Sequence, residues 1–158
     1  LLTTPIQLAN MTSAIANRGY YFTPHIVKSI DNDSIDSRFT KPLYTMIDSS
    51  LFEIVIKGMQ EVVEDEELGT SNIAKMENIT VCGKTGTAQN PHGEDHSIFI
   101  GFAPKDNPKI ALAVYVENGG WGSTWAVPIG SLMIEKYLND NIERGGLEKK
   151  ITEGIIEY

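Results

Sequence analysis

The segment from Lys109 to Glu117, KIALAVYVE, most constrains the fold of this chain, because every residue between its charged ends is apolar or aromatic. A strand with so few polar positions usually has both faces covered, as in the middle of a sheet that lies between helices. The segment follows Pro104-Lys-Asp-Asn-Pro108 and precedes the glycine-rich stretch 118–123, and both are typical of chain reversals. We therefore predict a central strand at Lys109 to Glu117.

Two further strands and three helices are predicted around this segment. The strands are Ile79 to Gln89 and Ser97 to Ala103, and the second of them forms a hairpin with Lys109 to Glu117. The helices cover residues 5–18, about 50–64 and about 125–139, on the basis of apolar spacing. This order predicts an α+β fold in which three antiparallel strands are packed by helices.

Local sequence also predicts how the helices begin and what lies between the first two. Thr4 with Gln7, and Ser50 with Glu53, have the spacing of capping boxes, and Asp48 and Ser49 could cap the second helix as well. Thr124 is the predicted cap of the last helix. Between the first two helices, Tyr20 to Lys28 is predicted to be extended and Ser29 to Pro42 to be a polar connection.

Length and charge limit the organisation and the partners of the chain. Its 158 residues suffice for one core and are too few for two domains. It starts Leu1-Leu2 without a methionine, and we expect it to begin inside a domain. We assign residues 1–140 to this globular unit and residues 141–158, which are polar and interrupted by two glycines, to a C-terminal tail without an assigned role. The net charge of -8 argues against a nucleic-acid partner.

The stretch Cys82 to Asn90, CGKTGTAQN, contains a Gly-Lys-Thr that is also found in phosphate-binding loops. Such a loop needs a glycine five residues earlier and a helix immediately afterwards, but position 78 is Asn and Pro91 follows the stretch. A nucleotide site is therefore unsupported here, and the stretch is better explained as a strand. Its lone cysteine, Cys82, is expected to be a small buried apolar residue.

As a strand, this stretch concentrates groups that suit an anionic, peptide-like ligand. Lys84 offers a cation, Thr85 and Thr87 offer hydroxyls, and Gly86 allows a ligand to approach the backbone. Strict alternation sends Lys84 and the two threonines to opposite faces of a sheet, so spacing alone does not bring them together. The alternative is an exposed edge strand with a solvated lysine.

Four segments in this order resemble class B penicillin-binding proteins, in particular penicillin-binding protein 2 of the rod-elongation type. They are TPIQLANMTSAIANRGYYFTPHIV, GMQEVVEDEELGT, VCGKTGTAQNPHGEDHSIFIGFAP and KIALAVYVENGG, which lie between positions 4 and 120. The second of them ends at Thr70. Lys84-Thr85-Gly86 matches the third signature motif of serine penicillin-interacting enzymes. The resemblance implies that residues 1–140 are the C-terminal portion of a transpeptidase domain with the serine β-lactamase and penicillin-binding-protein fold.

The resemblance also implies roles for the motif residues. Lys84 and Thr85 would bind the carboxylate of the substrate or antibiotic and take part in proton transfer, with Gly86 beside them. The backbone N–H of Thr87 would form one half of an oxyanion hole. The nucleophile would be a serine of a Ser-x-x-Lys pair, and no serine of these 158 residues has a lysine three positions later. Ser-x-Asn is absent too, and we interpret the similar Thr70-Ser71-Asn72 as a coincidence.

A parent enzyme of this family would cross-link peptidoglycan stem peptides through a serine acyl-enzyme and would bind β-lactam antibiotics. The resemblance further implies contacts with cell-elongation proteins and a place at the periplasmic face of the cytoplasmic membrane, anchored by upstream sequence. No cofactor is implied. Two other classes remain open from the residues: a β-lactamase or β-lactam sensor, and a non-catalytic module that binds peptidoglycan or a partner protein.

Two other residue pairs have side chains that could form a site. His92 and His96 have a spacing that could ligate zinc on a helix, but Pro91 and Gly93 oppose a helix there, so we expect no metal. Trp121 and Trp125 could form an aromatic platform for a ligand, yet we expect them to pack against the last helix, since aromatic side chains mostly serve burial.

The family fold, finally, has five strands, and the two contributed by upstream sequence would lie beside Lys109 to Glu117. Within this chain that strand would then be an open edge without the charges or proline that usually protect edges. The chain is therefore predicted to associate with itself through residues 109–117.

Overall fold

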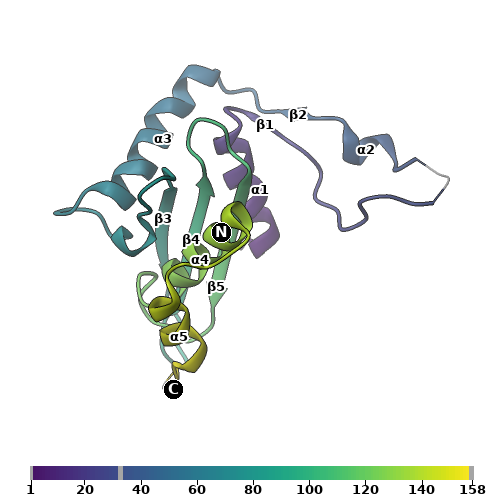
Figure 1. Ribbon diagram of the computed structural model, residues 1–158. Coiled ribbons are helices and arrows are strands. Elements are labelled where there is room, and N and C mark those ends of the chain that lie inside the picture. Colours follow the sequence, from purple (N-terminus) through teal and green to yellow (C-terminus); the bar gives the residue numbers. More distant parts are fainter. Residues whose placement is uncertain (1, 32–33, 157–158) are drawn as a thin grey trace.

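A computed structural model describes residues 2–31 and 34–156 of the chain. Its main sheet contains β3 (Cys82–Ala88), β4 (His96–Ala103) and β5 (Ile110–Val116), which are antiparallel and lie in the order β3-β4-β5 (Figure 1). All three strands lie within or one residue beyond the ranges predicted from the sequence. Thr85 is paired with Phe99, and Phe99 with Val114, so this row of residues crosses the whole sheet.

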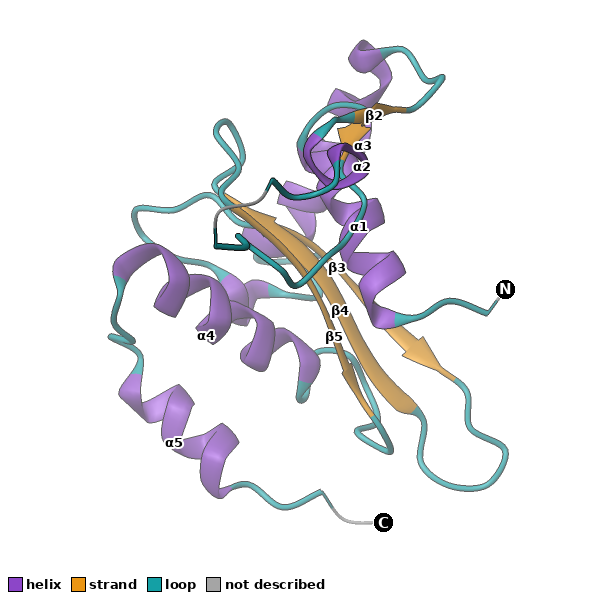
Figure 2. Cartoon of the chain, turned by 90° about the vertical axis from the view of Figure 1, so that its right-hand side faces the viewer, coloured by secondary structure: helices purple, strands orange, loops and turns teal. Residues whose placement is uncertain are grey.

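Helices cover both faces of this sheet, as the apolar β5 sequence predicts. Helices α1 (Pro5–Ala16) and α3 (Ser49–Glu64) lie on one face, and α4 (Ala126–Asn139) lies on the other (Figure 2). Two buried clusters result. The cluster that includes α4 contains Phe99, Leu112 and Ile134, and the cluster that includes α1 and α3 contains Phe102 and Ile56. No helix among the described residues is both long enough and apolar enough to cross a bilayer.

The ring of Phe99 lies fully buried in a slot formed by three glycines from three different elements. A β-carbon added at Gly83 of β3, Gly101 of β4 or Gly130 of α4 would lie 2.5, 2.9 or 2.6 Å from atoms of this ring. Contacts that close leave no room for a side chain, because interiors are packed as densely as organic crystals. The slot therefore fixes the distance between the sheet and α4 at Phe99, the cross-strand partner of Thr85.

The helix starts agree only in part with the predicted caps. Thr4 and Gln7 form the predicted capping box of α1. Helix α3 is capped by Asp48, whose carboxylate accepts from the Ser50 N–H at 2.8 Å. The predicted Ser50 and Glu53 box is therefore wrong, and the Glu53 carboxylate instead pairs with Arg18 Nε at 2.7 Å.

Helix α4 takes its cap from another element. Trp125, and not the predicted Thr124, occupies the N-cap position and contributes no side-chain bond. The hydroxyl of Ser97, a buried residue of β4, accepts from the first helical N–H, that of Ala126, at 3.1 Å. Tertiary contact has replaced local capping here, because an orphan N–H can be satisfied by any nearby acceptor.

The segment between α1 and α3 differs from the prediction. Of the expected extended stretch Tyr20 to Lys28, only β1 (Tyr20–Tyr21) forms a strand, and it pairs with β2 (Leu43–Tyr44) in a two-stranded sheet. The short helix α2 (Ser37–Thr40) lies between them, within the predicted polar connection. Two-residue strands carry no periodic sequence signal, so this pairing was missed.

The C-terminal segment contains a helix, α5 (Gly145–Glu153), that packs against α4. Arg144, immediately before α5, pairs with the buried Glu135 of α4 through Nε and Oε2 at 2.8 Å. The same guanidinium donates through Nη1 to the carbonyl oxygen of Ile73 at 2.8 Å. Ile73 belongs to the short helix η1 (Asn72–Ala74), so Arg144 connects the end of the chain to the segment that follows α3.

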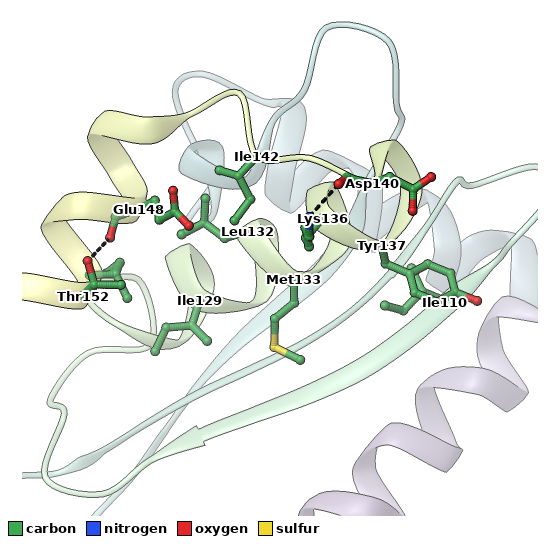
Figure 3. A pocket seen from close by; sticks show the side chains of 11 residues that line it. Ile110, Ile129, Leu132, Met133, Lys136, Tyr137, Asp140, Ile142, Glu148 and Thr152 are labelled. Carbon is green, nitrogen blue, oxygen red and sulfur yellow. Dashed lines mark hydrogen bonds between the residues drawn. The ribbon is translucent and has the colours of Figure 1, made fainter.

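A groove of about 690 Å³ lies between α4, α5 and the first residue of β5 (Figure 3). Apolar side chains dominate its walls, and two of those on α4, Met133 and Tyr137, are 51% and 60% exposed. Ile110 lines the groove at the point where β5 begins. In the described part of the chain β5 pairs with β4 alone, so its other edge is open next to this apolar surface.

We expect the isolated chain to self-associate through β5, because an open apolar strand beside an apolar groove favours pairing with another copy. Light scattering over a concentration series should show a mass that rises above that of one chain. Tyr115→Lys places a charge on an exposed position of the strand and should shift the equilibrium toward the monomer. A strict monomer at every concentration would contradict the expectation.

Candidate active site

The predicted motif residues lie at the free edge of the main sheet. Lys84, Thr85, Gly86 and Thr87 are all in β3, which pairs with β4 and has no second neighbour among the described strands. Cys82, the first residue of the same strand, is fully buried, as predicted, and burial raises the pKa of its thiol to about 12. A thiol with so high a pKa is a poor nucleophile, so Cys82 serves packing.

Lys84 and Thr85 meet around this edge although they leave the strand on opposite faces. The Lys84 ammonium donates to the carbonyl oxygen of Thr85 at 3.0 Å and lies 3.4 Å from its hydroxyl oxygen. An edge strand permits this, because no neighbouring strand blocks the path of the lysine side chain. The Lys84 ammonium and the Thr85 hydroxyl therefore lie next to each other, which the alternation of the sequence alone did not predict.

Thr70 adds a hydroxyl that the sequence interpretation missed. Its Oγ1 lies 3.0 Å from Oγ1 of Thr85. Thr70 precedes η1, and the interpretation of Thr70-Ser71-Asn72 as a coincidence does not anticipate this contact. A signal was present, since Thr70 is the last residue of the resembling segment GMQEVVEDEELGT.

These groups line a cavity of about 290 Å³. The residues around it come from β3, from Thr70 and from the loop that leads into α4: Thr70, Lys84, Thr85, Gly86, Thr87, Trp121, Gly122 and Ser123. The cavity combines one ammonium group, several hydroxyls and an indole, a set that suits a ligand with a carboxylate next to an apolar part.

Trp121 contributes the indole, and its position corrects a prediction. It is 75% exposed at the cavity and is not packed against the last helix. Trp125, by contrast, packs against Gly154 beyond the end of α5. Trp121 is thus the residue of this pair that a ligand could contact.

The loop that carries Trp121 is held tightly against the sheet. A β-carbon at Gly122 would lie 2.6 Å from the Ile98 carbonyl oxygen and 2.7 Å from that of Gly86, so only glycine fits there. The Ser97 hydroxyl donates to the Trp121 carbonyl oxygen at 2.9 Å. These contacts fix the loop relative to β3.

The two histidines weighed as metal ligands have other surroundings. His96 Nδ1 accepts from the Asn118 N–H at 3.1 Å, and its ring lies 5.2 Å from that of Tyr115. The His92 N–H donates to the Asn90 side chain at 3.0 Å. Within residues 2–31 and 34–156, no group of three or more His, Cys, Asp or Glu side chains is arranged to hold a metal ion.

Comparison with known proteins gives a consistent match. A family model described as the penicillin binding protein transpeptidase domain matches residues 1–135. The peptidoglycan D,D-transpeptidase MrdA of Haemophilus influenzae is 34% identical over 88% of this chain and 24% of its own length. The peptidoglycan D,D-transpeptidase PbpA of Mycobacterium tuberculosis is 32% identical over 85% of this chain and 29% of its own length.

Solved structures agree with these matches. Pseudomonas aeruginosa PBP2 in complex with WCK 5153 is 36% identical with a TM-score of 0.75, over 90% of this chain and 32% of that one. Penicillin-binding protein A of M. tuberculosis, in an imipenem acyl-enzyme complex, is 28% identical with a TM-score of 0.69, over 86% of this chain and 31% of that one. The chain spans between a fifth and a third of the length of the curated relatives named first.

Proposed function

Because the chain belongs to the penicillin-binding protein transpeptidase family, we propose that it is the C-terminal part of a peptidoglycan D,D-transpeptidase that acts by serine acyl transfer. Residues 1–140 then belong to the C-terminal portion of the transpeptidase domain, and residues 141–158, which include α5, form the segment that follows it. The observation that carries the proposal is the meeting of Lys84, Thr85 and Thr70 at the free edge of β3, in a cavity open to a ligand.

In the proposed mechanism this chain supplies one wall of the active site. Lys84 and Thr85 bind the ligand carboxylate by charge-assisted hydrogen bonds. Gly86 lets the ligand backbone approach the strand, and the Thr87 N–H donates to the oxyanion that develops on the attacked carbonyl. A serine contributed by upstream sequence attacks that carbonyl and expels the terminal residue of one stem peptide. The amine of a second stem peptide then displaces the serine and completes the cross-link.

The ligands and partners of the whole protein follow from this role. Its substrate is the peptidoglycan stem peptide, and β-lactam antibiotics are its inhibitors because they acylate the same serine. We also propose cell-elongation proteins as partners and a site of action outside the cytoplasm, with upstream sequence as the membrane anchor. The matching family model is a transpeptidase model, which favours this function over a β-lactamase, a β-lactam sensor or a non-catalytic binding module.

We expect the 158-residue chain alone to remain unlabelled by a β-lactam, because it has no serine followed by a lysine three positions later. Intact-mass spectrometry after incubation with benzylpenicillin should show only the unmodified mass. The full-length protein treated in parallel should gain the mass of one penicillin. A stoichiometric adduct on a serine of the isolated chain would contradict the proposed site, and an unlabelled full-length protein would contradict the proposed function.

A further inference from the structure

The contact between Thr70 and Thr85 joins the site to a loop outside the recognised motif. The two hydroxyl oxygens are 3.0 Å apart, and both side chains line the cavity next to β3. The side chain of Thr70 is exposed and is not part of a buried cluster. The hydroxyl is therefore placed to act on Thr85 rather than to support the core.

The loop that holds Thr70 is braced on both sides. The Asp65 carboxylate accepts from the N–H groups of Glu67 and Leu68 at 2.9 Å each, and the Ser71 N–H donates to the Val62 carbonyl oxygen at 3.0 Å. The two bonds to Asp65 also hold the pKa of its carboxyl below the usual range, with the Leu68 N–H as the larger cause.

The next residues fix the loop to the end of α3. The Asn72 side-chain amide donates to the Val63 carbonyl oxygen at 3.2 Å. A β-carbon at Gly69 would collide with the Asp65 carbonyl oxygen, so the turn just before Thr70 is also as tight as glycine permits. The hydroxyl of Thr70 is thus presented from a rigid support, which a group that orients another side chain requires.

The direction of the hydrogen bond matters for ligand binding. A threonine hydroxyl has one proton to donate and can accept two bonds. Lys84 Nζ, 3.4 Å away, can only donate to Thr85. If Thr70 also donates to Thr85, both accepting positions of Thr85 are used and its own proton points to the cavity, where a carboxylate can accept it. Chains of hydrogen bonds of this kind strengthen one another.

We propose that Thr70 is a positioning residue that holds the Thr85 hydroxyl as a donor to the carboxylate of the ligand. This inference rests on the proposed function, because it assumes that Thr85 binds a carboxylate. Thr70 lines the cavity, but it acts on the ligand by orienting Thr85 and takes no part in bond making.

The test compares Thr70→Val and Thr70→Ser in the full-length protein. Valine keeps the shape of threonine and loses the hydroxyl, whereas serine keeps the hydroxyl. We expect Thr70→Val to lower the second-order rate constant for acylation by benzylpenicillin about tenfold, and Thr70→Ser to stay within about twofold of the unsubstituted protein. Thr152→Val, which removes a hydroxyl bonded within α5, is the matched control and should change nothing.

A second ligand distinguishes a loss of Thr85 orientation from a general disturbance of the active site. The methyl ester of benzylpenicillin has no carboxylate anion, so its acylation rate constant should differ by less than about twofold between Thr70→Val and the unsubstituted protein. The assignment is overturned if Thr70→Val acylates normally, if the serine variant is as slow as the valine variant, or if the ester loses as much as the acid. If the unsubstituted protein is not acylated at all, the proposed function fails and this assignment fails with it.

Discussion

Replacing Lys84 by alanine in the full-length protein is expected to slow acylation by a β-lactam about 100-fold, equivalent to about 3 kcal/mol of transition-state stabilisation. The loss has a local cause, because the ammonium group is the only cation that lines the cavity with Thr85 among the described residues. Lys84 is exposed and bonds only to Thr85 in the described contacts, so the free energy of unfolding should change by less than about 0.5 kcal/mol.

Lys75→Ala provides the matched control for this experiment. Lys75, which directly follows η1, is exposed like Lys84, but its ammonium pairs with Glu66 at 3.0 Å and does not line the cavity. The control removes the same charge and should leave the acylation rate constant within about twofold. If Lys84→Ala acylated as fast as this control while its melting temperature fell by several degrees, Lys84 would be a structural residue of an edge strand.

Arg144→Ala is expected to lower the free energy of unfolding by about 3 kcal/mol, the usual cost of leaving a buried charge without its partner. Glu135 is only 4% exposed, and its carboxylate accepts from Arg144 Nε at 2.8 Å and from the Glu143 N–H at 2.9 Å. Lys149→Ala is the control on the same segment. It breaks an exposed pair with Glu153 at 3.9 Å and should cost less than about 0.5 kcal/mol.

The effect of Arg144→Ala should depend on pH. Burial raises the pKa of Glu135. The hydrogen bonds from Arg144 and from the Glu143 N–H together lower it by more than burial raises it, so the resulting pKa lies below the ordinary 4.5. A lowered pKa contributes stability above the unfolded-state pKa, and this contribution is lost as the pH falls through the folded-state value. The difference between the two proteins should therefore be full at pH 7 and shrink as the pH falls below the ordinary pKa of 4.5.

Thermal unfolding at several pH values, together with hydrogen exchange of the α5 amides, measures this prediction. We expect a lower melting temperature and faster exchange in α5 for the variant at pH 7. A variant that loses α5 protection without any change in global stability would show that the Glu135 pair holds only the end of the chain. A difference that grows as the pH falls would contradict the role assigned to the Glu135 carboxylate.

The sequence predicted those elements whose signal lies in their own residues. The apolar run in β5 and the capping box at Thr4 were found within a residue or two, since periodicity and capping are local. The α5 helix was missed because it starts with Gly145 and Gly146, which disfavour helices. The contact of Arg144 with Glu135, directly before this helix, joins residues of two different helical segments and has no local sequence signal. Tertiary contact also replaced Thr124 by Ser97 as the cap of α4.

The sequence predicted only part of the candidate site. The motif residues of β3 were identified from their types and from the resemblance, but their convergence was not. The meeting of Lys84 with Thr85 depends on β3 being an edge, and the contribution of Thr70 depends on how the loop after α3 passes this edge. Such relations join residues that are distant in the chain, and spacing within one segment does not contain them.

The glycine slot around Phe99 changes how substitutions among relatives should be interpreted. Gly83 stands next to Lys84, and its loss in a homologue would look like the loss of a ligand-binding glycine. Its neighbour in space is the Phe99 ring, at 2.5 Å from an added β-carbon, so a larger residue at 83 requires a smaller one at 99. The residues at positions 83, 99, 101 and 130 should therefore covary, so that their combined side-chain volume still fits the slot. Gly86, whose added β-carbon would lie 3.3 Å from Ile98, does not contact the Phe99 ring, so under the proposed function its variation would reflect the ligand and not this packing.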